Sequence, residues 1–231
     1  MIKMCYAENY RKFHLPKPNP VAGFFMSRLQ KKAEKIGQKN FHAFNLWYIV
    51  NTFFPNAKGL SVADIGAYDG WMLSYNGPEV NRRIAIDFDD FFKEKCKENS
   101  IEFICADVEK GPVALPDASC DIVLICSTLE HLSNPEEIAS EIYRILKKNG
   151  IVFVTVPDIE KYKFAFFNDI THKRPFTKRS LEFLFACFGF STLVARSYNH
   201  DLFTVSFLFP RFLQPLLQHA SGAQLLYIGR K

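Results

Sequence analysis

The sequence predicts an α/β domain on a doubly wound, mostly parallel sheet. Two short apolar runs, residues 60–64 and 83–87, each end in an acidic residue and lie one strand–helix–strand unit apart. A length of 231 residues suits one such domain with modest additions, and 48% apolar residues can fill the core on both faces of a sheet. We therefore expect strands that alternate with crossover helices.

Composition narrows the class of protein. A formal charge of +5 is mild and no aromatic–basic RNA motif is present, so we expect no nucleic-acid partner. The six cysteines include no C-x-x-C pair, which predicts reduced thiols of a cytoplasmic protein and no metal site. The N-terminus lacks the apolar run of a secretory signal, and no window approaches the ~18 apolar residues of a membrane span.

Residues 1–55 are predicted to form an arm and a helical lid before the main domain, residues 56–231. A proline-rich piece precedes a basic amphipathic helix over residues 21–36, and a richly apolar helix follows over about residues 41–54. Such helices either cover a ligand or pack against the edge of the sheet. The sequence leaves both roles open.

The turn after the first strand is the centre of the predicted site. Asp64 ends the strand, and the order Asp-x-Gly-x-x-x-Gly places Gly66 and Gly70 where a ligand can lie against bare backbone. A dinucleotide fingerprint would read G-x-G-x-x-G and face a diphosphate, whereas this chain has Tyr68 near the middle position. The pattern therefore disfavours a nicotinamide-dependent oxidoreductase.

Carboxylates follow one predicted strand after another, at Asp64, Asp87, Asp107 and, beyond the fourth strand, Glu130. Crowded anions would repel a diphosphate, but they suit a ligand with an ammonium group, a sulfonium group, two ribose hydroxyls and an amino-purine. S-adenosylmethionine has all four features.

At these residues the chain resembles the class I methyltransferases, whose first motif is typically Asp-x-Gly-x-Gly-x-Gly. The resemblance covers about residues 41–231. It is most specific over residues 107–157, which are similar to the small-molecule branch, types 11 and 23, of quinone and sugar methyltransferases. It implies a Rossmann-like seven-stranded sheet with an antiparallel last strand and additional N-terminal helices.

The remaining elements are predicted in chain order. A short helix follows Gly70, since Gly77 and Pro78 must end it. Later helices are expected over residues 91–99, up to residue 146, and up to residue 188. The later strands are expected over residues 101–106, 120–126, 151–156, 191–196 and 224–229.

The resemblance also implies roles for the turn residues. Asp64 and Gly66 would hold the amino-acid end of the cofactor, Asp87 the ribose, and Asp107 the adenine amino group, with the Val108 backbone nearby. Phe88 would lie beside the adenine face, unless it belongs to the core. The other cofactor contacts are expected in the same loops, at Tyr68, Gly70 and Ser127.

An oxygen acceptor must lose a proton, and His131 and His172 are the candidate bases near neutral pH. Either histidine could instead be hydrogen-bonded structure. Residues 158–179 are aromatic and basic, which favours a small-molecule or glycan acceptor that is anionic or lipid-linked, although a solvated charged face fits equally. A second insertion, residues 200–222, is apolar and either touches a membrane or partner or packs on the core.

Two function classes therefore remain. The first is an S-adenosylmethionine-dependent methyltransferase acting on a small molecule or glycan, at oxygen. The second is a catalytically silent protein that keeps the fold as a binding or scaffold module, which Tyr68 and the short helix after Gly70 leave open.

Overall fold

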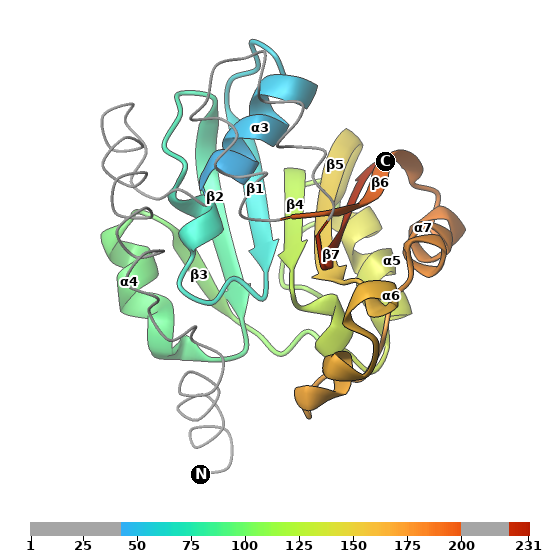
Figure 1. Cartoon of the computed structure of the whole chain (residues 1–231). Coiled ribbons are helices and arrows are strands. Elements are labelled where there is room, and N and C mark those ends of the chain that lie inside the picture. The colour runs from blue at the N-terminus through green and yellow to red at the C-terminus, as the bar shows by residue number, and fades with distance from the viewer. Residues whose placement is uncertain (1–42, 200–221) are drawn as a thin grey trace, which may run out of the picture.

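The computed structural model describes residues 43–199 and 222–231, which form one seven-stranded sheet in the order β3-β2-β1-β4-β5-β7-β6 (Figure 1). β7 runs antiparallel to both of its neighbours, and the other neighbouring pairs are parallel. This arrangement confirms the predicted fold class. The strands are β1 (Leu60–Ile65), β2 (Val80–Asp87), β3 (Glu102–Cys105), β4 (Cys120–Cys126), β5 (Leu146–Pro157), β6 (Ser191–Tyr198) and β7 (Gln224–Arg230).

Helices cover both faces of the sheet. The α-helices are α3 (Ala43–Phe53), α4 (Lys93–Glu98), α5 (Pro135–Ile145), α6 (Ile159–Tyr162) and α7 (Lys178–Cys187). Short 3-10 helices lie between them: η1 (Trp71–Ser74), η2 (Asp90–Phe92), η3 (Leu129–His131) and η4 (Lys163–Asn168).

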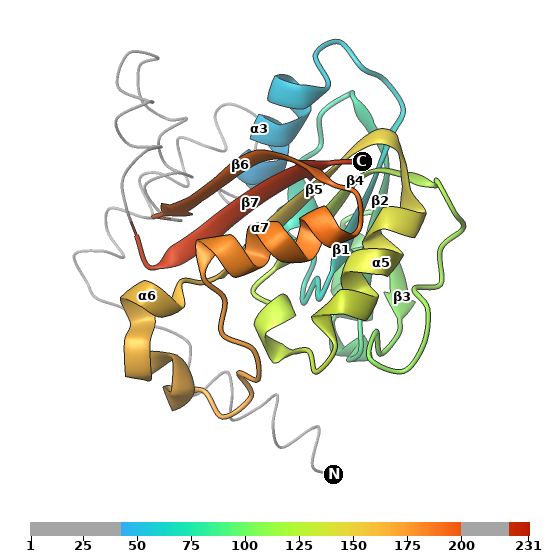
Figure 2. The same cartoon turned by 90° about the vertical axis from the view of Figure 1, so that its right-hand side faces the viewer.

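Alternate residues of each strand point to opposite faces, so the sheet has two cores. On one face, Ile65 and other strand residues pack with α5 and α7, which lie over the same side in Figure 2. On the other face, Val62 and Leu124 pack with α3, η1 and α4. Because β1, β2 and β4 are parallel, their carboxyl ends lie at one edge of the sheet, where such strands present ligand-binding loops.

The predicted elements agree with the structure except at some ends. β4 has the predicted bounds, 120–126, and residues 122–125 at its centre are all buried. The helix predicted up to residue 146 ends at Ile145, since Leu146 is extended and already pairs with Cys120 of β4. The short helix expected after Gly70 is a single 3-10 helix of four residues.

Some predictions fall outside the described residues: the arm, the helix over residues 21–36, and most of the insertion over residues 200–222. The second predicted helix is present as α3, and its buried residues Leu46 and Ile49 pack in the core beside the sheet. The five cysteines within the described ranges are free thiols. Within residues 43–199 and 222–231, no helix has the length and apolarity needed to cross a membrane.

Candidate functional site

The turn after β1 has an unusual backbone. Gly66, Tyr68 and Gly70 all have positive φ, at 74°, 51° and 73°. A Cβ on Gly66 would lie 2.2 Å from Thr128 Oγ1, so a side chain here would both strain the backbone and collide with the β4 loop. Tyr68, which stands near the middle glycine of the typical motif, takes the left-handed conformation that glycine adopts easily.

Asp87 joins this turn to the tip of β2. Its Oδ2 accepts a hydrogen bond from the Tyr68 amide at 2.9 Å, and its Oδ1 accepts one from the Asp89 amide at 3.1 Å. Burial nevertheless raises the pKa of Asp87 above its usual value, against the effect of these amides. A hydrogen-bond donor from a ligand would therefore stabilise the ionised carboxylate.

Asp64 is buried within β1, with only 2% of its surface exposed. Burial, and then the charge of Asp87, raises the pKa of Asp64 well above its usual value. Asp64 also lines a cavity of about 120 Å³. The other lining residues are Gly66, Trp71, Met72, Cys126, Ser127, Thr155 and Gln224.

The structure therefore brings Asp64, Gly66 and Ser127, three of the residues predicted to hold the cofactor, together around one cavity. The sequence analysis did not predict five of the residues that line this cavity. Trp71 and Met72 directly follow Gly70, and Cys126 directly precedes Ser127, so their positions in the chain could have found them. Thr155 and Gln224 belong to β5 and β7, where the sequence carries no local signal.

The predicted adenine side is lined with aromatic rings. The Tyr68 ring centroid lies 4.0 Å from that of Phe92, and Phe88 has 48% of its surface exposed. Phe88 is thus not a core residue. Val108 is half-buried and packs against the core.

Asp107 follows β3, but its carboxylate already has partners. Its Oδ2 forms an ion pair with Lys110 at 2.7 Å, and its Oδ1 accepts a hydrogen bond from the Glu109 amide at 3.2 Å. The Lys110 pair is largely exposed and therefore weak. An adenine amino group would compete with it for the same oxygen.

The two candidate bases lie side by side, with ring centroids 4.8 Å apart. His131 belongs to η3, and His172 lies in the loop between η4 and α7. Burial, and then the charge of His172, lowers the pKa of His131, so this imidazole is neutral at neutral pH. A neutral imidazole can accept a proton.

Two carboxyl groups accompany the histidines. Burial raises the pKa of Glu130 to about 8, and the charge of Asp169 adds to this effect. Burial alone would also raise the pKa of Asp169, but hydrogen bonds from Thr171 and the charges of the imidazoles lower it. The sequence identified Glu130 as one of the carboxylates that follow the strands, without a role of its own, and did not single out Asp169.

The basic residues near the histidines have structural partners. Lys173 Nζ lies 3.0 Å from Glu109 Oε2, and the Arg174 Nη2 donates to the Ser133 carbonyl at 2.9 Å. These contacts hold the loop against the segment after η3. Part of the excess positive charge of residues 158–179 is therefore paired with other groups of the protein.

Part of this chain is similar to known methyltransferases. Residues 63–154 match the methyltransferase domain family of type 11. Phosphoethanolamine N-methyltransferase 1 of Triticum aestivum is 33% identical over 114 residues, which are 46% of this chain and 23% of that protein. Malonyl-[acyl-carrier protein] O-methyltransferase of Marinomonas sp. is 29% identical over 120 residues, 46% of this chain and 44% of the relative. The matches span less than half the length of these relatives.

The fold is shared with solved structures. A crystal structure of an S-adenosylmethionine-dependent methyltransferase from Archaeoglobus fulgidus has a TM-score of 0.62 at 20% identity, over 82% of this chain and 92% of that one. At this identity the likeness shows the fold alone. The family match over residues 63–154 and the shared fold together identify a methyltransferase domain whose cofactor is S-adenosylmethionine.

Proposed function

We propose that this chain, which carries a class I S-adenosylmethionine-dependent methyltransferase domain of the type 11 branch, transfers a methyl group to an oxygen of a small-molecule or glycan acceptor. The main support for the proposal is the position of two carboxylates at the turn after β1. The buried carboxylate of Asp64 and the carboxylate of Asp87 flank the Gly66 turn, beside a cavity of about 120 Å³. An ammonium group and ribose hydroxyls are the ligand groups that such an arrangement favours.

The described residues fit this cofactor. Asp64 would pair with its ammonium group, because a cation relieves the cost of a buried carboxylate. Gly66 allows the tight turn between these carboxylates, because a Cβ there would collide with Thr128 Oγ1. Asp87 would accept from the ribose hydroxyls and Asp107 from the adenine amino group, while Tyr68 and Phe88 offer exposed rings on the same side.

S-adenosylmethionine supplies a methyl group that is already activated on a sulfonium. The protein then has to align the acceptor oxygen with the methyl carbon and keep water out, and such orientation contributes roughly 7–11 kcal/mol. His131 or His172 takes the proton that the acceptor hydroxyl loses. The carbon–oxygen bond forms as the carbon–sulfur bond breaks, and the electron pair of the broken bond goes to sulfur.

Two exposed apolar groups support an amphiphilic acceptor. Phe164 and Ile170 have 89% and 91% of their surfaces exposed, on and just after η4. Lys161 and Lys163, both exposed, lie in the same segment. A lipid-linked or anionic aromatic acceptor would meet both kinds of group, whereas a small neutral sugar would not need the apolar ones.

Methyl transfer from S-adenosylmethionine labelled in its methyl group tests the proposal. We expect label to enter one class in a panel of phosphorylated sugars, lipid-linked sugars and phenolic acids, in a bond that resists mild acid as an ether does. Label in an amine would retain methyl transfer but contradict oxygen as the acceptor atom. No transfer to any class, with intact cofactor binding, would contradict the enzyme.

The alternative is a catalytically silent binding or scaffold protein. η1 favours it, since one 3-10 helix replaces the longer helix whose N-terminal amides would face an anion. In addition, the Trp71 amide already donates to Asp69 Oδ1 at 3.2 Å. Binding of S-adenosylhomocysteine without turnover on any acceptor would support this alternative.

A further inference from the structure

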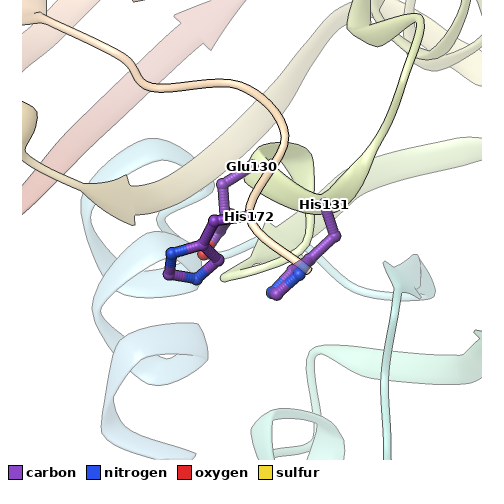
Figure 3. A group of neighbouring side chains, drawn as sticks. All are labelled: Glu130, His131 and His172. Atoms are coloured by element: carbon purple, nitrogen blue, oxygen red, sulfur yellow. The ribbon is translucent and has the colours of Figure 1, made fainter. Parts of the chain in front are cut away.

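Glu130, His131 and His172 converge at the carboxyl edge of the sheet, although the sequence alone predicts no metal site. Each offers one ligand atom, and the three atoms lie within 4.8 Å of one another. Figure 3 shows the Glu130 side chain reaching toward the His172 ring, with His131, the next residue of η3, beside them. We refer to these three residues as the histidine cluster.

The backbone holds this cluster together. The amides of Lys173 and Arg174 both donate to the Glu130 carbonyl, at 2.8 and 3.0 Å. These bonds fix the loop that carries His172 directly against η3, which carries Glu130 and His131. The cluster is thus built by paired main chains and does not depend on the chance positions of long side chains.

Hydrogen bonds set the tautomer of each ring. His172 Nδ1 lies 2.8 Å from the Phe166 carbonyl, which can only accept, so Nδ1 carries the proton. Thr171 Oγ1 donates to Asp169 Oδ1 at 2.6 Å and therefore accepts from His131 Nδ1 at 2.9 Å. In their neutral forms both rings have the lone pair on Nε2, the form in which imidazole binds metals. His172 Nε2 also lies 3.8 Å from Asp169 Oδ2, so this carboxylate borders the cluster.

The Glu130 side chain gives a second, independent reason to expect a ligand in the cluster. Its side chain has 1% of its surface exposed, and its Oε2 is buried with no hydrogen-bond partner among the described residues. A buried carboxylate oxygen without a partner costs free energy unless a ligand satisfies it. Figure 3 shows this side chain directed into the cluster.

We propose that the histidine cluster binds one divalent transition-metal ion through the Glu130 carboxylate and the Nε2 atoms of His131 and His172. Two imidazole nitrogens and one carboxylate oxygen suit Zn²⁺, Mn²⁺ or Fe²⁺ better than Mg²⁺ or Ca²⁺. Bonds of about 2.1 Å to one tetrahedral ion place the ligand atoms about 3.4 Å apart, so atoms that now lie up to 4.8 Å apart approach by at most about 1.4 Å. Thr171 and Phe166 are positioning residues, since they orient the rings.

Three protein ligands leave open positions on the ion, and an acceptor oxygen fits one of them. This role rests on the proposed methyl transfer. When the ion is bound, it uses both imidazole lone pairs, and neither histidine can then act as the base proposed for the metal-free site. The ion instead lowers the pKa of the acceptor hydroxyl, which loses its proton to water. The oxygen then bonds to the methyl carbon, and the electrons of the carbon–sulfur bond stay with sulfur.

Calorimetric titration of the tag-free full chain with Zn²⁺ alone, and separately with Mn²⁺ alone, tests the site. We expect one equivalent bound by the wild type, and an affinity at least about tenfold lower in Glu130→Gln, His131→Gln and His172→Gln. Glu136→Gln is the matched control, since the same change is made on an exposed residue of α5, and it should bind like the wild type. Circular dichroism checks that each variant is folded.

Two outcomes would overturn the site: no equivalent bound by the folded wild type, or unchanged affinity in both histidine variants. Titration with S-adenosylhomocysteine in the presence of EDTA separates this proposal from the proposed function. Metal binding without nucleoside binding would leave the metal site standing and contradict the methyltransferase, and the reverse result would overturn the metal site only.

Discussion

The carboxylate edge, formed by Asp64, Gly66 and Asp87, and the histidine cluster are assembled in different ways. The carboxylate edge is local: a strand, a left-handed turn and the next strand of one parallel pair place all three residues. The histidine cluster joins segments 40 residues apart through hydrogen bonds. A motif in the sequence can therefore identify the first, whereas the second exists only after folding.

The largest effect is expected from Gly66→Ala in the carboxylate edge. The new Cβ would meet Thr128 Oγ1 at 2.2 Å, on a backbone with φ of 74°. We expect the free energy of unfolding to fall by about 2 kcal/mol and S-adenosylhomocysteine affinity to fall at least about tenfold. Urea unfolding and calorimetry measure these two changes.

Gly111→Ala is the matched control, because nothing lies within 4 Å of its added Cβ. It should change the free energy of unfolding by no more than about 0.5 kcal/mol. Equal behaviour of the two alanine variants would show that the turn does not require a glycine.

Thr171→Val breaks the histidine cluster without touching the carboxylate edge. The substitution removes the hydroxyl between His131 Nδ1 and Asp169 Oδ1. We expect methyl transfer to fall about tenfold, with a shifted pH profile and unchanged S-adenosylhomocysteine affinity. Thr171→Ser keeps the hydroxyl and should restore the rate, and failure of that rescue would reduce Thr171 to a packing role.

Asp64→Asn is expected to change stability and cofactor affinity in opposite directions. The pKa of Asp64 is raised by burial and by Asp87, so its contribution to stability is present below its unfolded pKa near 3.8 and is lost as pH rises through the folded pKa. The neutral amide avoids that loss. We therefore expect the variant to gain stability relative to the wild type between about pH 4 and about pH 7.5, while its cofactor affinity falls.

Urea midpoints at the two pH values measure this gain, with Asp90→Asn, an exposed change, as the control. A stability difference between Asp64→Asn and the wild type that does not change with pH would mean that Asp64 is not a costly buried acid.

The smallest effect is expected at Lys173. Its ammonium group pairs with Glu109 at 3.0 Å on a partly exposed surface. Lys173→Met should lower the free energy of unfolding by about 0.5 kcal/mol, and less at high salt, in thermal or urea unfolding. A large rise in acceptor KM with unchanged kcat would instead place Lys173 in contact with an anionic acceptor.

Local features could be predicted from the sequence, whereas contacts between distant segments could not. β4 and the Asp64 turn were predicted because a buried strand is a continuous apolar run and a sharp turn needs glycine. Thr155 and Gln224 were missed as cavity residues, because only strand pairing brings them there. Thr155 lies opposite Cys126 of β4, and Gln224 lies opposite Pro157 of β5. Each histidine was predicted as a candidate base, but their contact depends on main-chain bonds to Glu130 that no local pattern encodes.

Calorimetric titration with S-adenosylhomocysteine, with NADH as the control ligand, tests the central claim most directly when wild type, Asp87→Asn and Asp90→Asn are compared. We predict binding of S-adenosylhomocysteine and not NADH, an affinity at least about tenfold lower in Asp87→Asn, equivalent to about 1.4 kcal/mol, and no change in Asp90→Asn. Absence of binding by the folded wild type, or equal affinity in all three proteins, would contradict the assignment of the carboxylate edge as the cofactor site.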